Sequence, residues 1–221
     1  MPTLLFGSIS TLVDTSELQR AAFNVAFDRH GLPWTWGRDE YRELLTGNGG
    51  RQRIADYAEE QGTQVDATAV HETKSELFRE SLRSSPLGLR PGVADTLQAA
   101  REQGWRVALV TTTSRENLDA LFDGVDGLSA ADFEVVTDTS SVEQGKPDPA
   151  VYTFALGELG EPAGAAVAVE DNVGGVRSAQ AAGVACVAFA NENTVMHDFG
   201  DTPRVTRLAL DDLAGLVAER A

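Results

Sequence analysis

The chain has 221 residues, of which 42% are hydrophobic, and it carries a formal net charge of −16. This size supports one good hydrophobic core, with room for a modest second domain as an insertion. The negative charge argues against nucleic acid and anionic membranes as partners, because the overall field repels phosphate groups. No apolar run is long enough to cross a bilayer, and the first residues lack the pattern of a signal peptide.

Cysteine and lysine are both scarce. The single cysteine, Cys186, lies in the apolar run GVACVAFA, so it cannot form an intramolecular disulfide, and we interpret it as a small buried hydrophobe. This cysteine usage favours a reducing, cytoplasmic setting. The only two lysines are Lys74 and Lys146, and each is therefore a candidate functional residue.

Short apolar runs alternate with helical patterns along most of the chain. The runs predict strands, in chain order, at Thr3–Phe6, Arg106–Val110, Phe133–Val136, Ala165–Val169 and Val184–Phe189. The helical patterns lie at Val93–Gln103, Arg115–Phe122, Pro149–Leu159, Val173–Ala182 and Asp211–Ala218. Such alternation predicts an α/β fold built on a doubly wound parallel sheet.

A different pattern follows the first strand. From Asp14 to about Pro86 helix follows helix, with apolar periodicity in Leu18–Phe27, Glu40–Leu45, Gln52–Ala58 and Val70–Leu82. The breakers HGLP and TGNGG separate these helices, and SSPLGLRPG forms a return hinge. We therefore predict a helical domain at 14–85, inserted into a core domain made of 1–13 and 86–221.

Polar loops follow the predicted strands at the sheet edge where open parallel sheets bind ligands. The loop LVTTTS offers the hydroxyls of Thr111 and Thr112 at a helix start, which suits a phosphate oxygen. Lys146 supplies a point charge, and Glu170 and Asp171 are oxygen ligands suited to Mg²⁺. Taken singly, these residues also fit plain helix caps, a solvated lysine and a polar loop, whereas the ordered set indicates a phosphate site.

This ordered set, with the insertion after the first strand, resembles the haloacid dehalogenase superfamily of phosphatases and phosphomutases over essentially the whole chain. The segments TGNGGRQRIADY, TTTSRENLDALF and ANENTVMHDF are similar to the sugar-phosphate branch that contains β-phosphoglucomutase and xylulose bisphosphate phosphatase. The resemblance implies a Rossmann-like core with a helical cap. It also implies that Thr111 binds the phosphoryl oxygen, that Lys146 neutralises its charge, and that Glu170 and Asp171 hold or orient Mg²⁺.

The resemblance extends into the inserted helices. There it implies that Arg51 reaches a distal phosphate of the substrate and that Lys74 faces the same cleft. Arg51 has an equally open alternative as a solvent-facing residue at a helix start. Where this branch usually has a histidine that contacts the sugar, the sequence has Gln19.

The sequence departs from the family at its first motif, Asp-x-Asp-x-Thr. Aligned through TLVDT, the nucleophile position holds Gly7 and the acid/base position holds Ile9, while Thr11 remains. Gly7 cannot form an aspartyl-phosphate or ligate a metal. Ile9 cannot move a proton, a contribution worth roughly 10²- to 10⁴-fold in rate. We therefore expect ordinary family turnover to be near background, and a metal site weakened by the loss of the first aspartate.

Nearby side chains offer poor substitutes for the missing acids. Ser8 and Ser10 could attack phosphorus only with an adjacent base. Of the three histidines only His197 could approach the site, and we interpret it as a structural or surface residue rather than as a substitute for the missing acids. Asp14 lies beyond the strand end, where an acid fits a helix cap better.

Three functions stay open at this point. The leading hypothesis is a phosphatase-like protein without standard turnover that binds a small phosphorylated metabolite or a protein partner. The second is an active hydrolase in which Mg²⁺ on Glu170 and Asp171 activates water and cleaves a small sugar phosphate. The third is an interaction module, with a homodimer as one form of it and Trp34 and Trp36 as a contact surface, although such aromatic residues also pack onto their own domain.

Overall fold

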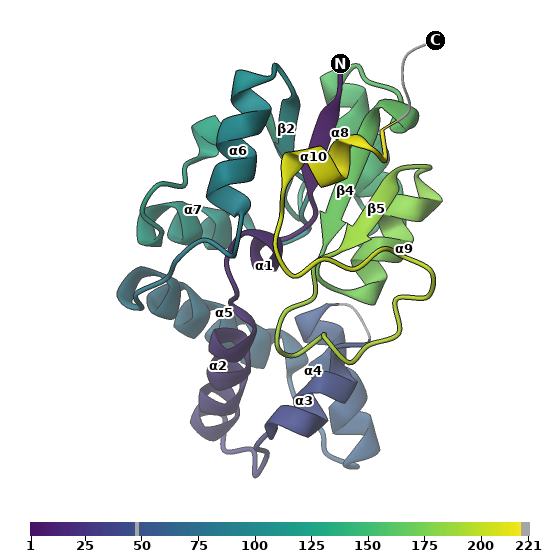
Figure 1. Cartoon of the computed structure of the whole chain (residues 1–221). Helices are drawn as coiled ribbons and strands as arrows, with labels where there is room; N and C mark the ends of the chain where they lie inside the picture. Colours follow the sequence, from purple (N-terminus) through teal and green to yellow (C-terminus); the bar gives the residue numbers. More distant parts are fainter. Residues whose placement is uncertain (47–48, 218–221) are drawn as a thin grey trace.

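A five-stranded parallel sheet forms the centre of the molecule (Figure 1). A computed structural model describes residues 1–46 and 49–217. The strands lie in the spatial order β3-β2-β1-β4-β5, and every neighbouring pair is parallel. Their bounds are Thr3–Phe6 for β1, Arg106–Leu109 for β2, Val135–Val136 for β3, Ala166–Glu170 for β4 and Ala185–Ala188 for β5. The strand order reverses between β1 and β4, so the crevice beyond the carboxyl ends of these strands is the expected place for a ligand.

Helices cover both faces of the sheet. After the short α1 (Ile9–Leu12), the helices that return to the sheet are α6 (Val93–Glu102), α7 (Arg115–Gly124), α8 (Ala150–Leu159), α9 (Val173–Ala181) and α10 (Leu210–Ala214). Two single 3₁₀ turns lie at Ala130–Asp132 and Ala163–Ala165. This arrangement confirms the predicted α/β fold. None of the helices that the structure describes is long and apolar enough to span a membrane.

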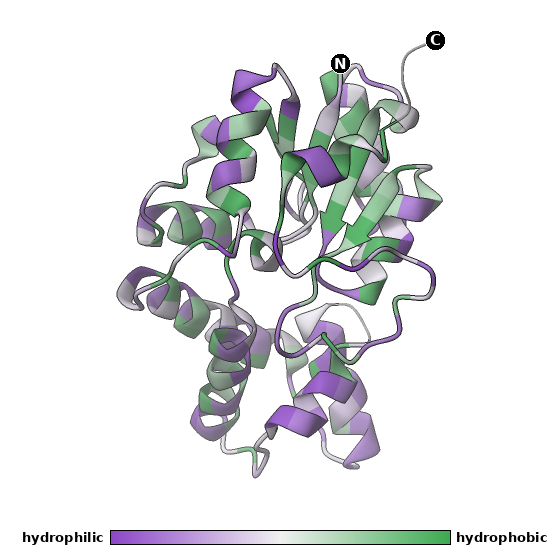
Figure 2. Cartoon of the chain, in the orientation of Figure 1, coloured by the Kyte–Doolittle hydropathy of each residue, from purple (hydrophilic) through white to green (hydrophobic). Residues whose placement is uncertain are grey.

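Side-chain alternation along the strands explains the two cores of the sheet. Leu4 and Phe6 of β1 face a core shared with α6, α7 and α10, whereas Leu5 faces a core shared with α8 and α9. Cys186 belongs to the second core and is a buried free thiol, as the sequence predicts. Figure 2 shows the strands as the most hydrophobic part of the ribbon, with hydrophilic residues on the outer helices.

Four helices follow the first strand and its turn. They are α2 (Ser16–Arg29), α3 (Arg38–Leu44), α4 (Gly50–Glu60) and α5 (Ala67–Ser84), and Figure 1 shows them together at the lower end of the view. Helices α2 to α5 share a third core, while Phe78 and Leu82 near the end of α5 join the core of the sheet. Helix α5 therefore packs on the sheet-side helix α7 as well as on α2 and α4.

Trp34 and Trp36 lie inside this third core. They are only 7% and 0% exposed, and Phe27 contacts both indole rings edge to face, with centroids 5.4 and 4.6 Å away. The backbone around Trp36 is held by Asn24, whose amide accepts from the Trp36 N–H at 2.8 Å and donates to its carbonyl at 3.1 Å. The hypothesis of an exposed tryptophan contact surface is therefore wrong, because both rings are used in packing.

Candidate functional site

The turn after β1 begins a short helix. Gly7 N–H donates to the carbonyl of Val169 on β4 at 2.9 Å, which extends the pairing of the two strands by one residue. Ser8 is the N-cap of α1, and its Oγ accepts from the Thr11 N–H at 3.2 Å. Ile9 is buried in the first core. Residues 8 to 11 are thus used for capping and packing, which explains how the turn forms without an acid.

Glu170 lies buried beneath Gly7, at the end of β4. Its side chain is 0% exposed, and its Oε1 accepts hydrogen bonds from Tyr152 Oη and Lys146 Nζ, each at 2.6 Å. A Cβ atom at position 7 would lie 2.1 Å from Glu170 Cδ, and one at Gly175 would lie 2.1 Å from Glu170 Oε2. The carboxyl group therefore occupies its place because residues 7 and 175 are both glycine.

Lys146 joins Glu170 to the ends of two strands. Besides Glu170, its Nζ donates to the carbonyl of Val110 at 2.7 Å and to the carbonyl of Gly7. Three acceptors match the three protons of an ammonium group. Burial raises the pKa of Glu170, while Lys146 opposes that rise, and Glu170 Oε2 is buried with no hydrogen-bond partner. The Lys146 charge is therefore met by protein groups before any ligand arrives.

Asp171, the next residue, faces the cleft and lies at the centre of a polar cluster. Its Oδ1 accepts from Ser8 Oγ at 2.7 Å and from Asn172 Nδ2 at 3.0 Å, and its Oδ2 accepts from Asn191 Nδ2 at 2.9 Å. Its own carbonyl accepts from Thr194 Oγ1 at 2.6 Å. Asp171 thus connects the β1 turn, the start of α9 and the loop at 190–198.

The threonine loop after β2 is held by backbone hydrogen bonds. Thr111 N–H donates to Thr137 Oγ1 at 2.8 Å, and that hydroxyl donates back to the Thr111 carbonyl at 2.7 Å. Thr111 Oγ1 accepts from Thr113 N–H at 3.2 Å, and Ser114 caps α7. Thr111 and Thr112 both line the cleft. The Thr111 hydroxyl proton therefore stays available to an oxygen bound there.

The opposite wall of the cleft comes from α2, α4 and α5. Lys74 Nζ donates to Gln19 Oε1 at 3.0 Å and lies 4.8 and 4.7 Å from the ring centroids of Phe23 and Phe78. Burial lowers the pKa of Lys74 to about 7, with the nearby Arg53 adding to the effect. Burial likewise lowers the pKa of His71 to about 4, and the charge of Lys74 acts in the same direction.

These two walls enclose two adjoining hollows. A cleft of about 420 Å³ is lined by the expected residues Gln19, Arg51, Lys74, Thr111, Thr112 and Asp171. A second hollow of about 500 Å³ shares Arg51, Thr111 and Thr112 with it and adds Gly7 and Lys146. Glu170 lines neither hollow, because its side chain is turned into the sheet-side core. The structure thus brings all the candidate residues except Glu170 to one continuous cleft.

Some cleft residues were missed from the sequence, and the exclusion of His71 was wrong. His197 makes a 2.9 Å hydrogen bond with the carbonyl of Arg42 on α3, which fits the structural role expected for it, whereas His71 was not expected to approach the site and lines the cleft. The signal for His71 was its position three residues before Lys74 on the same helix, which places both side chains on one face. No such signal pointed to Ser8 and Asn191 as partners of Asp171, because their approach depends on loops distant in sequence.

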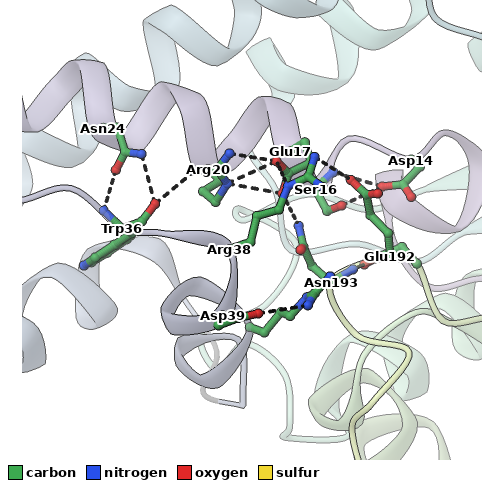
Figure 3. Close-up of polar contacts among 12 residues, drawn as sticks. Asp14, Ser16, Glu17, Arg20, Asn24, Trp36, Arg38, Asp39, Glu192 and Asn193 are labelled. Atoms are coloured by element: carbon green, nitrogen blue, oxygen red, sulfur yellow. Dashed lines mark hydrogen bonds and ion pairs between the residues drawn. The ribbon is translucent and has the colours of Figure 1, made fainter.

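A polar cluster joins α2 to the loop at 190–198 (Figure 3). Glu17 accepts from Arg20 at 2.8 Å, from Arg38 at 3.1 Å and from Asn193 Nδ2 at 2.8 Å. The Arg20 hydrogen bond is the main cause that lowers the pKa of Glu17 to about 2. Just before α2, Asp14 accepts from the Ser16 N–H at 3.1 Å, so its carboxylate bonds the first N–H of the helix, although the N-cap residue is Thr15.

Known proteins are similar to this chain in sequence and in architecture. The family model for haloacid dehalogenase-like hydrolases matches residues 3–183. Protein CbbY of Cereibacter sphaeroides is 38% identical over 219 residues, which cover 96% of this chain and 95% of that protein. Protein CbbY of Rhodobacter capsulatus is 39% identical over 203 residues, covering 90% of this chain and 89% of that protein.

Solved structures give the same result. The crystal structure of CbbY from Rhodobacter sphaeroides in complex with phosphate matches with a TM-score of 0.85 at 38% identity, covering 92% of each chain. A mutant of that protein in complex with xylulose bisphosphate matches with a TM-score of 0.86 at 36% identity, covering 94% of each chain. The resemblance found in the sequence is confirmed: the chain belongs to the haloacid dehalogenase-like hydrolases, close to the CbbY proteins.

Proposed function

We propose that the chain binds a phosphorylated sugar in the cleft between its sheet and helices α2 to α5, without forming a phospho-enzyme at position 7. The observation that carries the proposal is the lining of this cleft. It combines the cationic Arg51 and Lys74 on one wall with the Thr111 and Thr112 hydroxyls on the other. A sugar with phosphate at both ends fits such a pair of walls. The sugar-bound CbbY mutant supports this choice of ligand class.

Six of the candidate residues take a role in this proposal. Thr111 and Thr112 bind one phosphate, with Lys146 behind them, and Arg51 and Lys74 bind the second. Gln19 fixes the Lys74 ammonium through its 3.0 Å hydrogen bond. In the same proposal, residues 14–85 are a cap domain on a core of 1–13 and 86–221, and the protein acts in the cytoplasm.

The loss of standard turnover rests on position 7. Glycine offers no atom that can attack phosphorus. The space that a longer side chain would need is filled by Glu170 and Tyr152, since a Cβ there would lie 2.1 Å from Glu170 Cδ and 2.6 Å from Tyr152 Oη. A simple Gly7→Asp repair would therefore have to displace Glu170. We take the filled space as support for a binding protein.

A second function, hydrolysis of a small sugar phosphate, is favoured by the family match and the close CbbY relatives. The comparisons support this function better than they support a binding protein, and members of the family generally use Mg²⁺. It requires chemistry that does not use position 7. Asp171 would then be the general base that takes a proton from a water or from the Ser8 hydroxyl. That hydroxyl already donates a hydrogen bond to Asp171 Oδ1 at 2.7 Å.

Calorimetry and a phosphate-release assay on the same preparation separate the two functions. With xylulose bisphosphate, we expect saturable binding and no release of phosphate above a buffer control. Lys74→Met should weaken binding by about tenfold, while Arg101→Ala on the far surface of α6 serves as the matched control and should leave it unchanged. Phosphate release that disappears in Asp171→Ala would establish the hydrolase instead. Absence of binding to any sugar phosphate would overturn both and leave an interaction module, which light scattering would reveal as an oligomer.

A further inference from the structure

The hydrogen-bond donors around Asp171 have a fixed orientation. Asn172 must point its NH₂ group at Asp171, because its Oδ1 accepts from the Gly175 N–H at 2.8 Å. Asn191 is fixed in the same way, since its Oδ1 accepts from Asn193 N–H at 2.9 Å and from Thr194 N–H at 3.1 Å. Turning either amide round would leave backbone N–H groups facing N–H groups. Both amides are therefore donors to the carboxylate.

Ser8 completes this set of donors. Its Oγ accepts from the Thr11 N–H, so the hydroxyl proton is free to point at Asp171 Oδ1, 2.7 Å away. Asp171 thus receives three side-chain hydrogen bonds, two on Oδ1 and one on Oδ2. Three donors aimed at one carboxylate stabilise its negative charge in the way that a bound cation otherwise would.

This arrangement does not fit Mg²⁺. The ion requires near-octahedral oxygen ligands at about 2.0–2.1 Å, and amide N–H₂ groups cannot ligate it. Glu170 lies outside the cleft with its Oε1 bonded to Lys146 and Tyr152, and Gly7 supplies no side-chain oxygen. Within 1–46 and 49–217, no three histidine, cysteine or acidic side chains come together in a way that could hold a metal ion.

We propose that the donors Ser8, Asn172 and Asn191 take the place of the magnesium ion, so that this cleft takes its phosphorylated ligand without a divalent cation. The ligand class follows from the proposed function, on which this part rests. The statement about the metal rests on the contacts of Asp171, the burial of Glu170 and the glycine at position 7, and it does not depend on the ligand class. The positive charge that a phosphate needs comes instead from side chains of the cleft, Arg51 and Lys74 on the helical wall.

The first test needs no ligand. Mn²⁺, a spectroscopic stand-in for Mg²⁺, is titrated into the full chain, and free Mn²⁺ is followed by electron paramagnetic resonance. We expect the free signal to be the same with and without protein, up to millimolar Mn²⁺. Loss of one equivalent of free Mn²⁺ per chain would overturn the proposal.

A matched pair of variants shows that the assay can detect a site when one exists. Ser8→Asp places a second carboxylate against Asp171, and two such groups repel unless a cation lies between them. The asparagine of Ser8→Asn has nearly the same shape as the aspartate of Ser8→Asp, but it can still donate a hydrogen bond to Asp171. Asparagine and aspartate both cap helices well. We expect the melting temperature of Ser8→Asp to fall and then to recover with Mg²⁺. The wild type and Ser8→Asn should respond to Mg²⁺ no more than to NaCl of the same ionic strength.

The second test uses ligand, and its outcomes separate this inference from the proposed function. Binding of xylulose bisphosphate is measured by calorimetry in EDTA and in Mg²⁺ at matched ionic strength. We expect the dissociation constant to change by no more than about twofold, a difference of about 0.4 kcal/mol. Binding only with Mg²⁺ would overturn the metal-free site and keep the proposed function. Binding under neither condition would overturn the proposed function and leave the Mn²⁺ result to decide the metal question.

Discussion

The two lysines of this chain face the same cleft from opposite walls and are held in different ways. Lys146 on the sheet side is bound to the Glu170 carboxylate at 2.6 Å and to two backbone carbonyls. Lys74 on the helical side is bound to the neutral amide oxygen of Gln19 at 3.0 Å and lies over two phenyl rings. Both side chains are nearly inaccessible to solvent.

The difference indicates where the cleft can attract an anion. A positive charge paired with a buried carboxylate is already compensated, so it adds little to the field that a phosphate meets. A positive charge held by an amide oxygen and two aromatic faces is not neutralised, so it still attracts a phosphate. Its burial lowers the pKa of the lysine. We therefore expect the sheet-side lysine to matter for stability and the helical-side lysine for binding.

Removal of the two partners should give the largest contrast. Glu170→Ala leaves the buried Lys146 without its carboxylate and is expected to cost about 3–5 kcal/mol of unfolding free energy. Gln19→Ala removes a neutral partner and is expected to cost about 1 kcal/mol. Urea unfolding of both variants at pH 7 measures the difference. Equal losses would show that the two lysines are held alike.

Filling the space above Glu170 should have the next largest effect. In Gly7→Ala the new Cβ must push Glu170 and Tyr152 aside, which is expected to cost about 1–3 kcal/mol. Gly145→Ala is the matched control in the same cleft, because its Cβ would have Thr112 Cγ2 as its nearest neighbour at 3.8 Å. That variant should change stability by no more than about 0.5 kcal/mol. A neutral Gly7→Ala would mean that Glu170 can leave its place easily.

The smallest expected effect is the pH dependence that Lys74 gives to binding. Because its pKa is lowered to about 7, Lys74 loses its proton as pH rises through 7, and sugar phosphate binding should weaken by about fivefold, or about 1 kcal/mol. The phosphate itself ionises near pH 6, so its own charge would strengthen binding with rising pH. Calorimetry above and below pH 7 should therefore show opposite trends for the wild type and Lys74→Met.

The lowered pKa of Lys74 also makes the unfolding free energy depend on pH. Between about 7 and 10.5 the unfolded chain binds more protons at Lys74 than the folded chain does, so the unfolding free energy rises with pH across that range. Below pH 7 Lys74 is protonated in both the folded and the unfolded chain, so the folded chain carries the full free-energy cost of burying the charge. Lys74→Met should lack this rise, and a wild type that loses stability between pH 7 and pH 10 relative to Lys74→Met would contradict the burial of a charged lysine.

The sequence predicted the fold well because the strands are short, apolar and bounded by turn residues. Each predicted strand occurs within two residues of its expected bounds, and α2 to α5 lie where the helical periodicity places them. Helix α1 was not predicted, since four residues carry too little periodicity to register. The strand predicted at Phe133–Val136 is shorter in the structure, where β3 begins at Val135, because Phe133 ends the 3₁₀ turn at Ala130–Asp132. The helix predicted at Asp211–Ala218 is shorter in the structure, where α10 ends at Ala214. Residues 47–48 of the TGNGG breaker and residue 218 lie outside the described residues.

The site was predictable as a set of residues but not as a set of contacts. Strand-end loops brought Thr111, Lys146 and Asp171 to one edge, as the rule for parallel sheets requires. The orientation of Glu170 was not predictable, since it depends on two glycines 168 residues apart, Gly7 and Gly175. The donors of Asp171 were hidden for a similar reason: Asn191 reaches it from the loop at 190–198, which is distant in sequence and is bonded to α3 through His197.

The position of the two lysines gives this protein an unusual chemical surface. The sequence has two lysines, and the side chains of both are buried in the cleft walls. An acylating reagent in water should therefore reach the two lysines only when helices α2 to α5 move away from the sheet. The rate of lysine acylation, read by peptide mass, would then act as a clock for that motion in the unmodified protein.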